Sequence, residues 1–366
     1  MIKSFAIACV LAFLTSSSLA RTPEPDPENI FMSEIVDRAI DDYIRPSFAR
    51  LAATTLDLQD TLSDYCEQPS ESGLLSVHAL FAGVVEAWSA VEFLRFGPLI
   101  DDNRLERLYF WPDRRGLGLK RITQALREQE EDVASAQALA EKSVAVQGLG
   151  ALDYLLYGTG SEELGDSTPT GRFRCGFALG VATNMAAISS ELRDDWANPD
   201  GYSALMKNAA DDNPVYRTSL EAASEIRDAI LEGLDIASDL KLKSALGEDS
   251  SSAAPKRSPL WRSGQTFPAL LANVDAIQKL LEAAGFTEGL PDEGQYLVNA
   301  LPFEFSNVKQ AIGAVDLPVE EAFTDPHMRG KLIYATIAID SLRDMIGEQM
   351  GAYLGFQPGF SSLDGD

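Results

Sequence analysis

Apolar side chains recur every three or four residues along much of the chain, which is the spacing of one face of an α-helix. The first such stripe runs from Val36 to Leu51 and contains Pro46, so it predicts one long helix with a kink. Further stripes occur at 220–234, 270–281 and 332–353. The polar-apolar alternation typical of strands is hard to find anywhere. The sequence therefore predicts an all-α fold.

Two breaks interrupt these helical stretches. The first is Asp211-Asp212-Asn213-Pro214, and the second is the polar, small-residue run 247–259, which is typical of a flexible loop. The length of 366 residues is enough for two domains of ordinary size. Long helices fall on both sides of the first break, so we expect two helical domains, 21–212 and 213–366.

The N-terminus has the features of a secretory signal peptide. Lys3 supplies positive charge, residues 5–14 are apolar, and Ser18-Leu19-Ala20 forms a small-residue cleavage site. The apolar run is shorter than the roughly 20 residues of a membrane-spanning helix. We therefore expect cleavage after Ala20, a periplasmic location and no stable membrane insertion of the mature protein.

Cleavage leaves two cysteines, Cys66 and Cys175, in a compartment where disulfides persist. One disulfide between them is the favoured interpretation, and two free buried thiols are the alternative.

The formal net charge of −26 repels nucleic acid and anionic lipid. Nucleic acid is thus excluded as a partner, and the charge is otherwise typical of a highly soluble surface.

Histidine is too scarce for the common histidine-based sites. His78 and His327 lie far apart, neither has a second histidine at helical ligand spacing, and no Gly-x-Ser-x-Gly nucleophile motif is present. Carboxylates are abundant enough to supply oxygen ligands for calcium, magnesium or ferric iron, but their abundance makes this a weak signal. The identity of any metal is left open.

Four short segments combine charge with aromatic residues. Glu92 and Arg95 are three residues apart, so an ion pair along one helix is the simplest interpretation. The alternative is that these polar groups converge on a cleft, where a ligand or partner would satisfy them. The segments are WSAVEFLRFGP (88–98), FWPD (110–113), GLGALDYLLYG (148–158) and WRSG (261–264).

Together with the chain end, LGF (354–356) and FSSLDGD (360–366), these segments resemble the imelysin-like family. The resemblance spans nearly the whole mature chain. It implies two helical domains related to four-helix bundles, with a functional cleft between them, in a family classed as metallopeptidases and associated with iron-regulated envelope proteins. Iron is thus a cofactor implied by analogy only.

The family's hallmark is Gly-x-His-x-x-Glu. Here it corresponds to the segment 148–153, in which Gly148 is kept, Gly150 replaces the histidine and Asp153 replaces the glutamate. Gly150 has no side chain that could bind a metal or move a proton. The residues that the resemblance assigns to the cleft are Glu92, Arg95, Trp111, Asp113, Gly148, Gly150, Asp153, Arg262 and Ser263.

These features favour a non-catalytic periplasmic binding or accessory protein with a link to iron uptake, whose partner is an unidentified small ligand or envelope protein. No catalytic residue is assigned. One alternative is a peptidase-like hydrolase that uses carboxylates alone. Another is a protein- or carbohydrate-binding module with a helical groove edged by Trp88, Trp111 and Trp261.

Overall fold

A computed structural model of the chain describes residues 27–357. Every regular element among those residues is helical, so the prediction of an all-α fold is confirmed. The longer helices are α1 (Pro27–Arg38), α2 (Arg45–Glu67), α3 (Glu71–Ser89), α5 (Leu117–Glu128), α7 (Gly148–Tyr157), α8 (Pro169–Ala197), α10 (Ser219–Asp235), α12 (Thr266–Ala284), α13 (Leu297–Gly313) and α15 (Pro326–Asp344). The short helices are α4 (Arg104–Leu108), α6 (Ala136–Ala140), α9 (Tyr202–Lys207), α11 (Ser244–Leu246), α14 (Val319–Ala322) and α16 (Gly351–Tyr353), and the π-helical stretches are η1 (Ala39–Ile44), η7 (Ile236–Lys243) and η11 (Met345–Met350).

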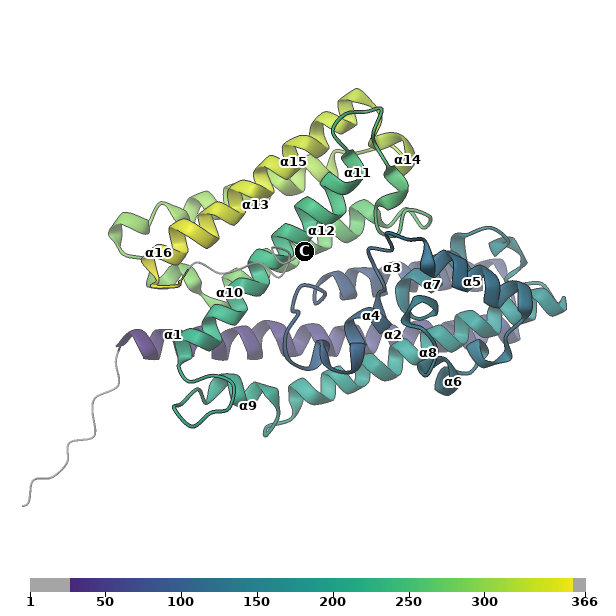
Figure 1. The fold of residues 1–366 in the computed structure, drawn as a ribbon, viewed down its shortest axis with the longest axis horizontal. Coiled ribbons are helices and arrows are strands. Elements are labelled where there is room, and N and C mark those ends of the chain that lie inside the picture. The colour runs from purple at the N-terminus through teal and green to yellow at the C-terminus, as the bar shows by residue number, and fades with distance from the viewer. Residues whose placement is uncertain (1–26, 358–366) are drawn as a thin grey trace, which may run out of the picture.

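The helices form two sets (Figure 1). In the lower set α2 runs beside α8 and also packs against α3, and in the upper set α13 runs beside α15. The sets contact each other through α1, which packs against α10 and α12, and through α3, which packs against α12. The break at 211–214 falls between α9 and α10. The division into domains 21–212 and 213–366 stays a prediction.

The first predicted helix is continuous through α1, η1 and α2. Its stripe faces the core, since Val36, Ile40, Ile44 and Phe48 are all buried. Pro46 cannot donate a backbone hydrogen bond, and it lies at the start of α2, directly after the wider turn η1. The region of the predicted kink thus contains a π-helical stretch followed by the proline.

A disulfide joins Cys66, near the end of α2, to Cys175 in α8. Their Cα atoms are 5.7 Å apart, and the two residues are separated by 109 positions in the sequence. The bond therefore fastens together two long helices that already run side by side, and it closes a long loop of the unfolded chain.

The predicted signal peptide, 1–20, and the terminal segment 360–366 lie outside the described residues. Within residues 27–357, no helix combines the length and apolar character needed to cross a bilayer.

The segment 247–259 is more ordered than its composition predicts. Its first part is a turn in which Asp249 accepts hydrogen bonds from the backbone N–H groups of Ser251 and Ser252, at 2.9 and 3.0 Å. Its last part is packed, since Ser258 and Leu260 are buried. The expectation of a flexible loop stays a prediction, and in the structure its end and the following Leu260 are packed.

One buried polar cluster joins the chain that follows α3 to η7 and α12. Lys241 of η7 donates to the carboxylate of Glu92 and to the side-chain carbonyl of Asn273, which in turn donates to the backbone carbonyl of Ser89 at 2.6 Å. The Lys241 and Glu92 side chains are only 3% and 4% exposed. Burial lowers the pKa of Lys241, and the Glu92 carboxylate opposes that shift. Each charge is thus tolerated because the other is present.

Replacing Lys241 alone should destabilise the fold strongly. Lys241→Met leaves the Glu92 carboxylate buried without its cation, which costs about 3–5 kcal/mol in the free energy of unfolding. The double variant Lys241→Met/Glu92→Leu removes both charges and should recover most of that loss. Urea unfolding followed by circular dichroism measures both values. A single variant that loses less than about 1 kcal/mol would show that the pair is not needed.

Candidate functional site

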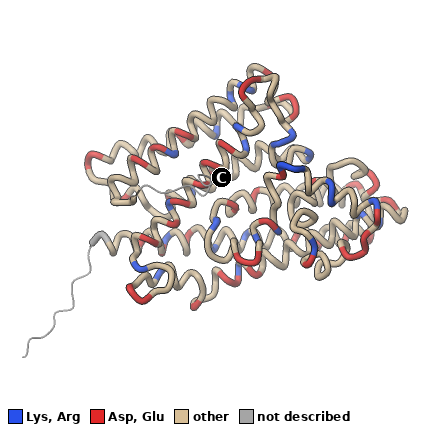
Figure 2. Tube along the Cα trace, in the orientation of Figure 1, with Lys and Arg blue, Asp and Glu red and all other residues tan. Residues whose placement is uncertain are grey.

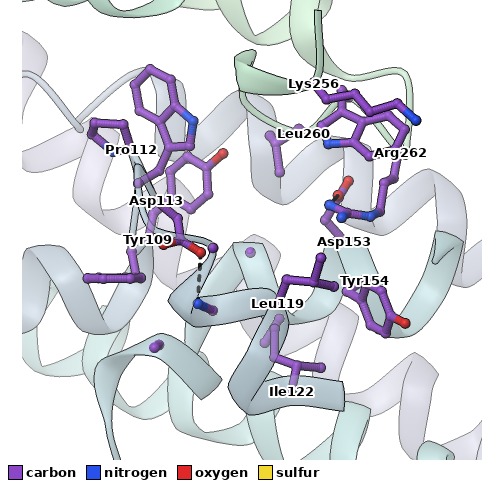
Figure 3. Close-up of a pocket in the computed structure, with 18 of the residues that line it drawn as sticks. Tyr109, Pro112, Asp113, Leu119, Ile122, Asp153, Tyr154, Lys256, Leu260 and Arg262 are labelled. Atoms are coloured by element: carbon purple, nitrogen blue, oxygen red, sulfur yellow. Dashed lines mark hydrogen bonds and ion pairs between the residues drawn. The ribbon is translucent and has the colours of Figure 1, made fainter. Parts of the chain in front are cut away.

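One cavity of about 1090 Å³ lies between α5, α7 and the segment that leads into α12. Its walls come from three parts of the chain, 109–123, 145–159 and 240–262 (Figure 3). This volume slightly exceeds the roughly 300–1,000 Å³ typical of small-molecule sites. The cavity is therefore large enough for an organic ligand.

The cavity brings together five of the residues expected in the cleft. They are Trp111, Asp113, Gly150, Asp153 and Arg262. The other four, Glu92, Arg95, Gly148 and Ser263, do not line it.

Glu92 and Arg95 do not form the intrahelical ion pair that their spacing suggests. Helix α3 ends at Ser89, so the two side chains are not on one helical face. Glu92 pairs with Lys241, and the Arg95 guanidinium lies 3.5 Å from the carboxylate of Glu232 on α10. The simplest interpretation is thus wrong, because the helix stops before the pair.

The two glycines of α7 have different structural roles. Gly148 starts the helix with a φ of +71°, and a Cβ atom there would lie 2.2 Å from the backbone oxygen of Leu108. Gly150 is in the helix, and a Cβ atom there would meet only the ring of Tyr109, at 3.8 Å. Gly148 is therefore required by the close approach of two backbone segments, whereas Gly150 leaves open space in the cavity.

Asp153 projects from the middle of α7 and is 3% exposed. Its Oδ1 atom accepts the backbone N–H of Ser263 at 3.1 Å, and its Oδ2 atom lies 3.7 Å from the guanidinium of Arg262. Burial raises the pKa of Asp153 above its ordinary value of 3.8, and the contacts with Ser263 and Arg262 oppose the rise. Ser263 thus supports the cavity by holding the Asp153 carboxylate in place.

These surroundings do not fit the metal site that the family resemblance implies. Gly150 has no ligand atom, and both oxygens of Asp153 already face donors. The guanidinium of Arg262 also places positive charge where a metal cation would bind. Within residues 27–357, no group of three or more His, Cys, Asp or Glu side chains is arranged to hold a metal ion.

Cations and aromatic rings are stacked on one side of the cavity. The guanidinium carbon of Arg262 lies 4.5 Å from the ring centre of Trp261 and 5.3 Å from that of Tyr154. The ammonium of Lys256 lies 4.7 Å from the ring centre of Trp261. Figure 3 shows Lys256 and Arg262 on the same side as Asp153, across from Pro112 and Asp113. The rings thus hold these cations in position.

Asp113 organises the opposite wall. Its carboxylate accepts the backbone N–H groups of Leu117 at 2.8 Å and Gly118 at 2.7 Å, so it caps the start of α5. Next to it, the rings of Tyr109 and Trp111 are stacked, with centres 6.2 Å apart and planes 9° from parallel. The FWPD segment therefore builds the wall, and its carboxylate is engaged in doing so.

The remaining candidates from the sequence lie elsewhere. His78 stacks on Tyr157 at 4.5 Å, and burial lowers its pKa. His327 is exposed in the first turn of α15. Trp88 is 3% exposed and does not line the cavity, so the groove edged by three tryptophans is not formed.

The sequence did not predict most of the cavity lining, including four of its five cations and Ser258. Lys256, Arg257 and Ser258 were assigned to a flexible loop, and Arg114 and Lys120 lie beside the FWPD segment without an aromatic signature of their own. The one sequence feature that could have indicated this cationic wall is the adjacent pair Lys256-Arg257, which stands in a polar run of an acidic chain.

Comparison with known proteins shows which family this chain belongs to. The sequence model of the Imelysin family, Peptidase M75, matches residues 44–346. The chain belongs to the imelysin family. Iron-regulated protein A of Synechococcus elongatus is 20% identical over 334 residues, which cover 88% of this chain and 86% of that protein.

Two solved structures of imelysin relatives share the fold. An imelysin-like protein from Psychrobacter arcticum superposes with a TM-score of 0.74 at 16% identity, covering 92% of this chain and 99% of that one. A putative iron-regulated protein A precursor from Parabacteroides distasonis superposes with a TM-score of 0.72 at 15% identity, covering 90% and 97%. The all-helical architecture is thus that of known imelysin-like structures.

The two glycines of the imelysin motif should respond oppositely to alanine. Gly150→Ala places a methyl group in open space within a helix and should stabilise the protein by about 0.5–1 kcal/mol. Gly148→Ala forces a methyl group against the backbone at Leu108 and should destabilise it by more than about 2 kcal/mol. Urea unfolding of the two variants tests both signs. Equal effects would contradict the assigned roles.

Asp153 should make stability depend on pH. Its raised pKa means that the folded protein holds this proton more tightly than the unfolded chain does, so its contribution falls as pH rises above about 4 and through the folded pKa. Asp153→Asn does not titrate, and the wild type should therefore lose stability relative to this variant over that range. Urea unfolding at several pH values measures the difference, and a pH-independent difference would refute the assignment.

Proposed function

We propose that this imelysin-family chain is a non-catalytic binding protein of the periplasm, and that the cavity beside α5 and α7 is its ligand site. The observation that carries the proposal is the open space at Gly150, where the family hallmark has a histidine. The space belongs to a cavity of ligand size, with aromatic and charged walls. Such a site holds a ligand without a reactive side chain at its centre.

The polar groups of the cavity support binding rather than chemistry. The carboxylate of Asp113 caps α5, and that of Asp153 faces Ser263 and Arg262. A general base needs a carboxylate within reach of a substrate proton, and here the oxygens of both carboxylates are held by other donors. The alternative hypothesis is a hydrolase that relies on carboxylates alone. Neither Asp113 nor Asp153 offers a carboxylate free of other donors for that role.

The periplasmic location is supported by the sequence of residues 1–20, with its positive start, apolar stretch and small-residue cleavage site. The link to iron is supported by the names of two relatives, an iron-regulated protein A and a putative iron-regulated protein A precursor. We therefore propose a role in iron supply, with an iron complex as the expected cargo rather than a bare ion, because Arg262 repels a cation at Asp153.

Calorimetry of the purified exported protein tests this function. We expect binding of at least one of ferric citrate, haem and a ferric siderophore, and none of ferrous iron alone. Gly150→Phe places an aromatic ring in the open space at Gly150, within the cavity, and should abolish that binding. Gly83→Phe is the matched control, since Gly83 also lies in a helix with open space around it and does not line the cavity.

Two outcomes would contradict the proposal. One is the absence of binding for every compound, or binding that Gly150→Phe leaves unchanged. The other is cleavage of casein that a chelator inhibits and that Asp153→Asn removes, which would instead establish the carboxylate-based hydrolase.

A further inference from the structure

We propose that the ligand of this cavity is a small organic anion with at least two negatively charged groups and a flat apolar body. The inference rests on the proposed role of the cavity as the ligand site and adds the chemical class of the ligand. It follows from the charges, the unpaired groups and the rings of the cavity walls.

The cavity is positively charged in a strongly acidic protein. Five cationic side chains line it, against the carboxylates of Asp113 and Asp153, whereas the chain as a whole carries a formal net charge of −26. Figure 2 shows acidic positions spread over most helices, with several basic positions gathered where the chain passes from α11 to α12. The cations of the lining are Arg114, Lys120, Lys256, Arg257 and Arg262.

Little of this positive charge is neutralised by the protein. Within residues 27–357, Arg114, Lys120 and Arg257 form no ion pair. Lys256 lies 3.4 Å from Glu320, but both side chains are exposed, and such a pair is weak. The Arg114, Lys120 and Arg257 side chains are exposed, so water screens their charge in the free protein and an anion bound in the cavity can pair with them.

The cations come from two separate walls. Arg114 and Lys120 belong to the start of α5 and the turn before it, whereas Lys256, Arg257 and Arg262 belong to the segment that leads into α12. A ligand with a single charged group would engage one wall and leave the other unsatisfied. Two or more negative groups would match both.

Ser258 supplies an independent sign of a missing partner. It lines the cavity, it is 2% exposed, and its hydroxyl has no hydrogen-bond partner among the described residues. Buried hydroxyl groups are nearly always hydrogen-bonded, because an unsatisfied one costs roughly 1–3 kcal/mol. A carboxylate, phosphate or sulfate oxygen beside Lys256 and Arg257 would accept this bond.

The tryptophan rings of the cavity favour a ligand with a flat apolar body. Trp111 on one wall and Trp261 on the other are both half-buried, so part of each indole faces the cavity. Flat apolar groups pack well against such rings, and the stacked cations at Trp261 add charge next to that apolar surface. A flat body with charged substituents therefore matches both features.

Fluorescence anisotropy with two pyrene probes tests the class of ligand. Pyrenetetrasulfonate is a flat polyanion, and pyrenemethanol is its neutral counterpart. We expect the tetrasulfonate to bind the wild type at least about tenfold more tightly than the neutral probe, with an affinity that falls as salt is added. Binding of the tetrasulfonate should be lost in Gly150→Phe.

Charge reversal supplies the matched comparison. Lys256→Glu/Arg257→Glu should weaken tetrasulfonate binding about tenfold or more. Arg193→Glu/Arg217→Glu changes the net charge equally at exposed positions outside the cavity and should leave the affinity within about twofold of the wild type, since distant exposed charges are screened.

The outcomes separate the ligand class from the site itself. If pyrenemethanol binds as tightly as the tetrasulfonate and Gly150→Phe abolishes both, the cavity is a ligand site and the anion class is wrong. If both double variants weaken binding equally, only the overall charge matters, and the class is again wrong. If neither probe binds, or Gly150→Phe binds both unchanged, the inferred class and the proposed site fail together.

Discussion

The buried pair of Lys241 and Glu92 is the interaction on which the arrangement of the two helix sets depends. It is the point where the chain after α3, η7 and α12 meet, and Asn273 extends it to the backbone at the end of α3. Apolar packing is tolerant of small shifts, whereas a buried ion pair loses its stabilisation when its geometry fails. Through Asn273, the same buried cluster ties α12 to the end of α3.

The same constraint positions the cavity. Leu240 and Ser244, which flank Lys241 in the chain, line the cavity, so one stretch of helix supplies both the buried cation and part of the cavity wall. The π-helical turn of η7 adds an extra residue per turn, which changes the directions in which successive side chains project. The segment that carries Lys256 and Arg262 then leads directly into α12, which Asn273 links to Lys241.

Sequence periodicity was sufficient for the fold class and for the first helix, because a buried face repeats at 3.6 residues whatever its partner is. The family resemblance, rather than periodicity, pointed to Asp113, Gly150 and Asp153, which line one cavity in the structure. Periodicity failed for Glu92 and Arg95, because their pairing depends on where α3 ends and on two partners that lie more than 100 residues away.

The cationic wall could not be predicted for a related reason. A polar, serine-rich run has the composition of a solvated loop, and only its contact with the rest of the chain shows that Ser258 and Leu260 are buried. Composition reports the average environment of a segment, whereas a binding wall is made by a few residues that face inward. The overall charge of −26 likewise conceals a local excess of positive charge.

The replacement of the family histidine by Gly150 changes the chemical role that the neighbouring side chains can have. Burial raises the pKa of Tyr109 well above its ordinary value, and the nearby carboxylates of Asp153 and Glu92 raise it further, so this phenol keeps its proton at neutral pH. Asp153 in turn is paired with Arg262. At Gly150 the wall lacks the imidazole of the family hallmark, and glycine has no side-chain group that could exchange a proton. What remains is a shaped, charged and aromatic surface, and such a surface can select a ligand by its charge and outline without transforming it.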